Sequence, residues 1–173
     1  MMYKPQIEAA SREIIEDLQL KLFQKQLRHV YKHSSTYKKK YDEVGLKPED
    51  IKTRDDIRKV PFTTKDDVRK SQEGNPPFGG ILCVPREDGV RYFETTGTSG
   101  APVRVLHTRK DWFSTGCDHV LYQAYGMGVE KSDIALIMFN YGLFTAWWGW
   151  QAGLEKLGCL IITTGGLGTK DRA

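Results

Sequence analysis

The chain has 173 residues, of which 39% are hydrophobic and 28% charged, and its formal net charge is +4. This length and balance are typical of one globular domain or of part of a larger one. Charges of both signs are mixed along the chain, apart from a basic stretch at residues 31–41 that we interpret as the solvated end of a helix. Since no periodic pattern of basic and aromatic residues occurs, we expect no nucleic-acid partner.

Three cysteines, Cys83, Cys117 and Cys159, are widely separated and have no metal-ligand spacing. This arrangement argues against a disulfide framework or a zinc site, so we expect a reducing compartment and no bound metal. Residues 1–15 lack the apolar run of a signal peptide, and the longest apolar runs, such as residues 134–139, have only the length of a strand. We therefore expect a soluble, cytoplasmic protein that does not contact a membrane.

A long helix is predicted first. Apolar residues recur at helical spacing from Ile15 to Tyr31, and Ser11 is a good N-cap with Glu13 in the first turn. We expect this helix to end near residues 33–35.

Two short helices are predicted next, at residues 54–59 and 65–71. Thr53 and Thr64 each stand three positions before an aspartate, as in an N-cap with an acid in the first turn. Pro61 separates the two helices. The sequence "EGNPPFGG" that follows is predicted to be a loop because of its Pro and Gly content.

Three strands are then predicted, at residues 81–84, 91–95 and 103–107. The loop between the last two would join them in a hairpin-like arrangement. Thr108 is expected to cap a further helix, which ends at Gly126 and Gly128.

The C-terminal part predicts a strand–helix–strand unit. Residues 132–139 read as a buried strand, residues 142–158 as a helix and residues 159–164 as the next strand. Two apolar strands separated by a helix indicate a βαβ unit with parallel strands. We expect an α/β fold with a mixed sheet, in which residues 1–80 form an N-terminal helical segment and residues 81–173 the first part of an α/β domain.

The end of the sequence resembles the first turn of another helix, at Lys170 and Asp171, with Thr169 as its cap. A domain whose sheet still lacks its covering helix is incomplete. We therefore expect this chain to be the N-terminal piece of a longer protein.

One loop has a composition suited to ligand binding. It consists of Thr, Ser and Gly only, at Thr95, Thr96, Gly97, Thr98, Ser99 and Gly100. Free backbone N–H groups and short hydroxyl side chains can converge on phosphate oxygens. The same residues also form ordinary hairpin turns. The spacing excludes a Walker A loop, which requires a lysine and a following helix, and it excludes a Rossmann fingerprint.

"TTGTSGAP" resembles the first signature of adenylate-forming enzymes, and three other stretches resemble the phenylacetate–CoA ligase family in particular. These are the stretch from "SSTYKKKY" to "PFTTKDDVR", the motif "YGLFT", and "GLEKLGCLIITTGG". They occur in the family's order and cover nearly the whole chain from about Tyr31 onward. The fold that this resemblance implies is the beginning of the AMP-binding domain of an adenylate-forming enzyme.

The resemblance implies an activity in two steps. Enzymes of this family join an arylacetic or similar carboxylic acid to AMP with Mg²⁺ and ATP, and then transfer the acyl group to coenzyme A. The loop from Thr95 to Gly100 would bind the departing phosphates. The acyl pocket would be lined by Phe139, Tyr141, Gly142 and Phe144. Gly165 and Gly166 would allow the backbone to approach the bound substrate or nucleotide. No catalytic residue and no metal ligand of the chain is assigned.

The chain departs from the family pattern at one position of the loop. The family carries Lys before the proline, whereas this chain has Ala101 before Pro102, so one cation is missing; Arg104 lies nearby in sequence. The family's adenine and ribose contacts and its lysine-bearing lid lie beyond residue 173. We therefore predict that this chain alone is inactive or nearly so.

Two further interpretations remain open. In the first, the chain is a non-catalytic remnant or binding module of the same fold. In the second, it is a relative that adenylates another acceptor, such as a deazaflavin cofactor. The interpretation as a remnant or binding module predicts exposed apolar surface on the helix at Trp147–Trp150, whereas otherwise we expect core packing as the main role of these tryptophans. Such a surface would promote association through this helix, for instance in a homodimer.

Overall fold

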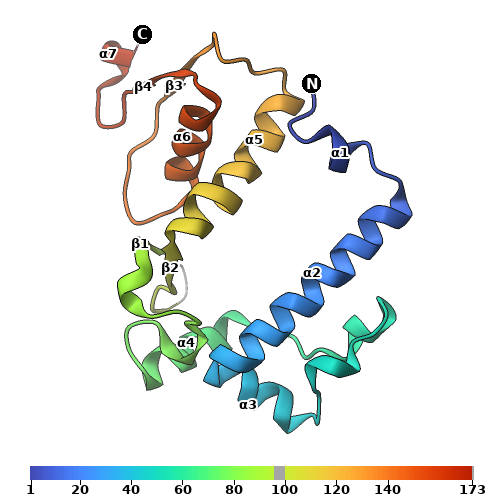
Figure 1. Cartoon of the computed structure of the whole chain (residues 1–173). Helices are drawn as coiled ribbons and strands as arrows, with labels where there is room; N and C mark the ends of the chain where they lie inside the picture. The colour runs from blue at the N-terminus through green and yellow to red at the C-terminus, as the bar shows by residue number, and fades with distance from the viewer. Residues whose placement is uncertain (96–99, 173) are drawn as a thin grey trace. The chain divides into compact units, whose positions relative to one another are not determined.

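The computed structural model describes residues 1–95 and 100–172 (Figure 1). Two compact units make up the chain. The first comprises Met1–Glu8, Asp88–Thr96 and Val105–Ala173, and the second comprises Ala9–Glu87 and Gly97–Arg104. Each unit has its own cluster of buried apolar side chains. The predicted division between residues 80 and 81 stays a prediction.

Helices α2 (Arg12–His33) and α3 (Ser35–Glu43) dominate the second unit. Ser11 caps α2 as predicted, since its side chain accepts a hydrogen bond from the backbone of Ile14. Ser34 ends α2 and caps α3, because its Oγ accepts from the Tyr37 amide. The core of the unit consists of Leu27, Val30, Tyr41, Leu46 and Ile51.

The short helices predicted after α3 are present, and the cap at Thr64 is confirmed, whereas Arg54 and not Thr53 holds the cap position of the first helix. The chain forms 3₁₀ helices at Pro48–Asp50 and Asp55–Lys59, and then α4 (Lys65–Gly74). Thr64 and Asp67 form a capping box, in which each side chain accepts a hydrogen bond from the other residue's backbone. This cap fixes the start of α4, which matters for the site described below.

The strand predicted at residues 81–84 is absent, and this prediction was wrong. Gly79–Ile81 form a 3₁₀ turn, and no strand includes residues 82–84. Side chains hold this turn, since the Ser34 hydroxyl donates to the Gly80 carbonyl and the Gly80 amide donates to Ser71 Oγ. Cys83 packs against the helical core instead of a neighbouring strand. The apolar run therefore serves helix packing.

The first unit contains a short N-terminal helix, α1 (Pro5–Glu8), and a two-stranded sheet of β1 (Gly89–Glu94) and β2 (Arg104–Thr108). Another 3₁₀ turn, Arg86–Asp88, precedes β1. After β2, Thr108 Oγ1 accepts from the Asp111 amide, so the predicted cap is confirmed. A π-helical turn at Asp111–Gly116 leads into α5 (Cys117–Gly126).

The predicted βαβ unit is confirmed. Strand β3 (Ile134–Ile137), helix α6 (Ala146–Leu157) and strand β4 (Leu160–Thr163) follow each other, and β3 pairs with β4 in parallel, with Ile134 opposite Leu160. Helix α6 packs against α5 (Figure 1). Gly158 ends α6 in the left-handed conformation, and a last helix, α7 (Thr169–Arg172), closes the chain.

Strand β3 is not buried on both faces, which corrects the prediction. Ala135 and Ile137 lie on the covered side, whereas Ile134 is 63% exposed and Leu136 is 45% exposed. Successive side chains of a strand point to opposite faces, so a sheet covered on one side alternates in this way. The continuous apolar run predicts a strand that is covered on both faces, but the described residues cover only one face of β3.

Helix α6 begins at Ala146, four residues later than predicted. Two backbone carbonyls in the preceding segment accept hydrogen bonds that are not part of the helical backbone pattern. The Gly142 carbonyl accepts from the Trp148 indole N–H at 2.9 Å, and the Leu143 carbonyl accepts from the Glu94 amide at 2.8 Å. These bonds hold residues 142–143 out of the helix. None of the described helices is both long and apolar enough to cross a bilayer.

Candidate functional site

The Ser/Thr/Gly loop runs from the end of β1 to the start of β2. Thr95 is half-buried and follows β1 directly, whereas Thr96, Gly97, Thr98 and Ser99 lie outside the described residues. Gly100 is described and has a φ of +122°, a backbone conformation that side-chain-bearing residues rarely adopt. The backbone therefore requires glycine at this end of the loop. The predicted role of the loop in phosphate binding stays a prediction.

Helix α4 holds the C-terminal side of this loop through two side chains. The amide of Gln72, which is 4% exposed, donates to the Arg104 carbonyl at 2.7 Å and accepts from the Arg104 amide at 3.0 Å. One turn earlier, Arg69 Nε donates to the Ala101 carbonyl at 3.0 Å. The chain on both sides of Pro102 is thus anchored to one face of α4.

Sequence reasoning did not identify Arg69 and Gln72 as site residues. They stand at positions i and i+3 of the helix that follows the Thr64 cap, so they share one face. The spacing was visible in the sequence. The sequence did not show that this face contacts Ala101 and Arg104, because each of these residues lies 32 positions further along the chain than its partner on α4.

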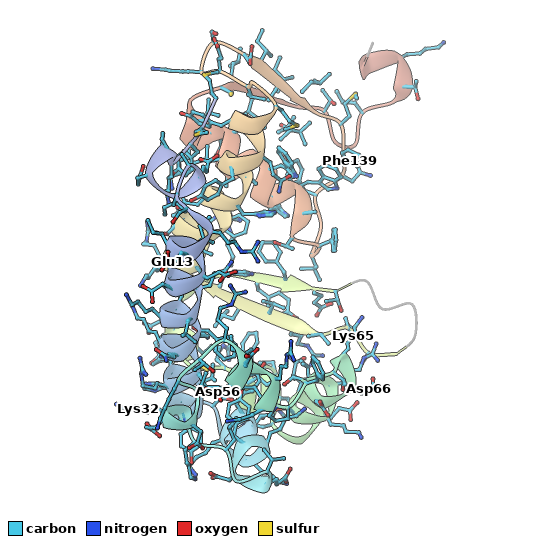
Figure 2. The ribbon with its side chains drawn as sticks, turned by 90° about the vertical axis from the view of Figure 1, so that its right-hand side faces the viewer. Glu13, Lys32, Asp56, Lys65, Asp66 and Phe139 are labelled. Atoms are coloured by element: carbon cyan, nitrogen blue, oxygen red, sulfur yellow. The ribbon has the colours of Figure 1, made fainter. Side chains whose placement is uncertain are left out.

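The Arg69 guanidinium lies against the loop with little charge compensation. Its side chain is 15% exposed, and Nη1 contacts Asp66 at 3.0 Å, but the Asp66 side chain is 74% exposed. Figure 2 shows Asp66 at the solvent-facing start of α4. Arg69 Nη2 is buried and has no hydrogen-bond partner within residues 1–95 and 100–172. A positive charge with unused donors therefore lies beside Gly100 and Ala101.

The predicted acyl-pocket residues are aromatic and partly open to solvent. The Phe139 ring, which is labelled in Figure 2, stacks on Trp147 with a centroid distance of 3.6 Å, and the centroid of the Tyr141 ring lies 4.5 Å from that of Trp148. Phe139 and Phe144 are each about half exposed, at 49% and 47%. Side chains of α6 therefore support one wall of aromatic rings, and the described residues leave its other side open.

Tyr141 carries a buried polar atom within this wall. Its hydroxyl has no hydrogen-bond partner in the part of the chain that the structure describes. Burial, followed by the negative charge of Glu155, raises the pKa of the Tyr141 phenol. The hydroxyl is therefore a neutral donor and acceptor at physiological pH.

The tryptophans of α6 differ from the prediction that they would be exposed. Trp147, Trp148 and Trp150 are half-buried. Trp147 stacks on Phe139, the Trp148 ring lies tilted against Tyr141, and Trp150 packs against the core of the first unit. Since adjacent residues of a helix face different sides, α6 supports the aromatic wall with one side and packs on the core of the first unit with another.

Strand β1 is joined to the aromatic segment within the first unit. The Glu94 amide bonds to Leu143, and the Arg91 guanidinium lies 5.0 Å from the Trp148 ring centroid and 5.4 Å from that of Trp112. The strand that leads into the loop and the segment that carries the predicted acyl pocket are therefore held together.

The two glycines at the end of β4 have different environments. A Cβ on Gly165 would lie 2.2 Å from the Phe139 carbonyl oxygen, so Gly165 permits a close approach within the chain itself. Gly166 has a φ of +89° and open space around it. The predicted approach of these glycines to a bound ligand stays a prediction.

Strongly perturbed carboxyl groups of the chain have structural partners. The pKa of Asp67 is lowered to about 2, first by the hydrogen bond from Lys40 and then by the Thr64 amide that belongs to the cap. The pKa of Asp56 is likewise lowered by Lys59 and by Thr53. Among the described residues, no group of three or more His, Cys, Asp or Glu side chains is arranged to hold a metal ion.

No family model matches the sequence. Curated relatives do match, and they include phenylacetate-coenzyme A ligases from Aromatoleum evansii, 38% identical over 160 residues, and from Pseudomonas putida, 34% identical over 160 residues. The aligned region covers 92% of this chain in both cases. The chain spans about 35% of the length of these relatives.

Solved structures of 2-hydroxyisobutyryl-CoA ligase have the same fold as this chain. One of them, in complex with 2-HIB-AMP and CoA, matches with a TM-score of 0.89 and 28% identity over 95% of this chain and 35% of that chain. Another, an open conformation with the same ligands, matches with a TM-score of 0.90 over 97% of this chain and 38% of that chain. These neighbours are adenylate-forming ligases whose complexes contain an acyl adenylate and CoA.

Proposed function

We propose that this chain, which is similar to phenylacetate-coenzyme A ligases over 92–96% of its length, belongs to that family of adenylate-forming enzymes and provides part of the site of an AMP-forming carboxylic acid–CoA ligase. This part comprises the loop for the departing phosphates and one wall of the acyl pocket. The observation that carries the proposal is the alignment with phenylacetate-coenzyme A ligase over 92% of the chain, which includes both the loop and the aromatic segment.

The reaction begins with a carboxylic acid and Mg²⁺–ATP as substrates. A carboxylate oxygen attacks the α-phosphorus, a new oxygen–phosphorus bond forms, and the bond to the leaving pyrophosphate breaks. Negative charge grows on the pyrophosphate, so preorganised donors that surround it stabilise the transition state. The Thr95–Gly100 loop, anchored to α4 on its C-terminal side, supplies these donors.

The second step transfers the acyl group to coenzyme A. The sulfur of CoA attacks the acyl carbon, a thioester forms, and AMP leaves with the electron pair of the broken acyl–oxygen bond. The thiol proton passes to solvent. No residue of this chain is assigned as a base for this step. Its contribution is to position the acyl adenylate, since orientation by itself accounts for a large part of such catalysis.

An aromatic acid suits the pocket wall best. Trp147 stacks on Phe139, Trp148 contacts the Tyr141 ring, and Phe144 adds a further partly exposed ring to the same segment. Flat apolar rings pack well against such a surface and gain free energy from both burial and ring contacts. We therefore favour an arylacetic acid over a short hydroxy acid.

The test joins this chain to the part of the Aromatoleum evansii ligase that it does not span, and measures ATP–pyrophosphate exchange with a panel of acids. We expect exchange above background with phenylacetate and little with 2-hydroxyisobutyrate. The 173-residue chain alone is expected to show none. The control is the same chimera with Thr98→Ala and Ser99→Ala, which removes two loop hydroxyls. A folded chimera without exchange for any acid would refute the proposal.

Ala101 favours a second candidate, a non-catalytic binding module of the same fold. The family places a lysine at this position, and a module that no longer stabilises pyrophosphate would not need it. This candidate predicts that the chimera folds and binds an acid but shows no ATP–pyrophosphate exchange. It also predicts that Ala101→Lys alone does not restore the exchange.

A further inference from the structure

Two histidines, His29 and His33, stand about one turn apart near the C-terminal end of α2. Residues at positions i and i+4 of a helix are neighbours on its surface, and here the centroids of the two imidazole rings are 4.8 Å apart, with the ring planes inclined by 39°. Both side chains are exposed, and neither has a hydrogen bond or an ion pair within residues 1–95 and 100–172. The described part of the chain therefore leaves their ring nitrogens available to a ligand.

The distance between the rings matches that of two ligands on one metal ion. A metal–nitrogen bond of about 2.0–2.1 Å, extended from the nitrogen to the ring centre, places each centroid about 3.2 Å from the ion. Two such rings are about 4.5 Å apart at a right angle and about 5.2 Å apart at the tetrahedral angle. The observed distance of 4.8 Å lies between these values. Small rotations of the side chains therefore suffice to direct one nitrogen of each ring to a common ion.

Burial on the opposite side of α2 holds the backbone beneath this pair. Leu27 and Val30 belong to the core of the second unit and are 3% and 9% exposed. Ser34, which is 2% exposed, donates its amide to the Val30 carbonyl at 2.9 Å and its hydroxyl to the Gly80 carbonyl at 2.6 Å. The helical spacing of the two histidines is thus fixed before a metal binds, and preorganised ligands lose less conformational entropy on binding.

We propose that His29 and His33 form a binding site for a divalent transition-metal ion such as Ni²⁺, Zn²⁺ or Cu²⁺. Imidazole suits these ions, whereas Mg²⁺ and Ca²⁺ take oxygen ligands. Two histidines at this spacing on a helix also supply two of the zinc ligands in the metalloprotease motif. The cysteines, from which the sequence predicts no metal site, play no part in it.

The site has two protein ligands and is otherwise open. Within the described residues, no third His, Cys, Asp or Glu side chain is arranged to complete a metal site. The other coordination positions therefore belong to water or to a donor of another molecule. The inference goes beyond the proposed ligase function and does not depend on it, since the ion of that reaction is Mg²⁺ bound to ATP.

Positive side chains on α2 set the salt dependence of this site. Lys25, Arg28 and Lys32 are exposed on the same helix, and Figure 2 labels Lys32 among them. These charges repel a dication, and salt screens the repulsion. We therefore expect Ni²⁺ to bind more tightly at moderate salt than at low salt, whereas a site made of carboxylates would show the opposite dependence.

The experiment titrates Ni²⁺ into the 173-residue chain by isothermal titration calorimetry; Ni²⁺ is preferred to Cu²⁺, which also oxidises free thiols. His29→Gln and His33→Gln should each weaken binding at least about 30-fold, because the second ligand of a pair binds intramolecularly, and the double substitution should cost no more than about threefold beyond either one. The matched control is His119→Gln, at an exposed histidine of α5 that contacts Gln123, which should change binding less than about twofold.

A shifted pair tests the dependence on helical spacing. Lys25 is exposed and stands four positions before His29, so Lys25→His in the His33→Gln background rebuilds the same spacing about one turn earlier. This variant should bind Ni²⁺ to within about threefold of the unchanged chain. Far-UV circular dichroism confirms that each variant is folded, and saturating Ni²⁺ should raise the unfolding temperature of the unchanged chain but not that of His29→Gln.

Three outcomes would overturn the inference. One is the absence of Ni²⁺ binding by the unchanged chain, and another is equal binding by folded His29→Gln. The third is a stepwise loss, in which each single substitution removes half of the bound Ni²⁺ and Lys25→His restores nothing, as expected of two separate imidazoles. None of these outcomes affects ATP–pyrophosphate exchange, so the inference and the proposed function hold or fail separately.

Discussion

At the scale of single residues, Asp118 shows how the first unit holds its N-terminal segment. Its carboxylate accepts hydrogen bonds from Tyr3 Oη at 3.0 Å, from Lys4 Nζ at 2.5 Å and from Lys156 Nζ at 2.8 Å. The Asp118 side chain is 17% exposed. Burial disfavours the charged form, but the hydrogen bonds from Lys156, Lys4 and Tyr3 outweigh it and lower the pKa to about 2.

This lowered pKa predicts a dependence of stability on pH. A carboxyl with a lower pKa in the folded state stabilises the fold above its unfolded pKa of 3.8, and this stabilisation is lost as the pH falls toward 2. We expect Asp118→Asn to lower the free energy of unfolding by roughly 2 kcal/mol at pH 7, and the difference from the unchanged chain to shrink between pH 4 and pH 2. Urea unfolding at several pH values measures both effects.

Asp17 provides the control for this prediction. It pairs with Lys21 on the surface of α2, where both side chains are well exposed. Exposed ion pairs contribute little, so Asp17→Asn should leave the free energy of unfolding nearly unchanged across the same pH range. Equal effects of the two substitutions would contradict the role given to Asp118.

At the scale of elements, the contact between α5 and α6 depends on a glycine in α6. A Cβ on Gly153 would lie 2.5 Å from Val120 Cβ and 3.3 Å from the Cys117 carbonyl oxygen, both on α5. Gly149, one turn earlier in α6, has no atom within 4 Å of the same position. The two glycines have the same helical conformation, and only one of them allows a neighbouring helix to approach closely.

This difference predicts opposite effects of two identical substitutions. Gly149→Ala should raise the free energy of unfolding by up to about 1 kcal/mol, because alanine favours a helix more than glycine does. Gly153→Ala gains the same preference but must push the two helices apart, so it should lower the free energy of unfolding by about 1–3 kcal/mol. Thermal unfolding of both variants decides between this expectation and a packing that tolerates a Cβ at Gly153.

At the scale of the whole molecule, the parallel sheet has one apolar face that the described residues leave exposed. Ile134 and Leu160 lie opposite each other in register and are 63% and 61% exposed, and Leu136 and Ile162 are also exposed. Because this chain spans about a third of its relatives, we propose that this face packs against the part of those proteins that lies outside it. Without such a cover, the face is expected to associate with other copies of the chain.

Sedimentation velocity tests this expectation. We expect the isolated chain to self-associate, and Ile134→Thr with Leu160→Thr to raise the monomer fraction, because threonine keeps the strand preference and reduces the apolar surface. The control is Ile14→Thr, which removes another exposed apolar side chain, on α2, at 60% exposure. A monomeric unchanged chain would contradict the prediction, and so would an equal effect of the control.

Local chemistry explains the elements that the sequence predicted correctly. The caps at Ser11, Thr64 and Thr108, the glycine that ends α6 at residue 158 and the βαβ order all depend on residues close together in the chain. The strand predicted at residues 81–84 failed because an apolar run forms a strand only beside another strand, and here the run packs on helices. Short apolar runs do not distinguish these cases.

Some features of the candidate site could likewise be predicted from the sequence, and others could not. The Thr/Ser/Gly composition of the loop and the order of the aromatic residues were visible in the sequence, and they carried the resemblance to the family. The anchoring of Ala101 by Arg69, the ring stack of Phe139 on Trp147 and the buried hydroxyl of Tyr141 were not. Each joins residues from different elements or depends on burial, which no spacing in the sequence specifies.

The sequence by itself determined where α2 and α4 begin, which C-terminal segments alternate as strand and helix, and which loop combines Thr, Ser and Gly, because backbone preferences and side-chain caps act over a few residues. Only the tertiary structure decided which charge stands beside that loop and which face of the sheet is bare. These features depend on how α4 meets residues 101–104 and how α5 and α6 cover the strands, and such contacts form between segments far apart in the chain.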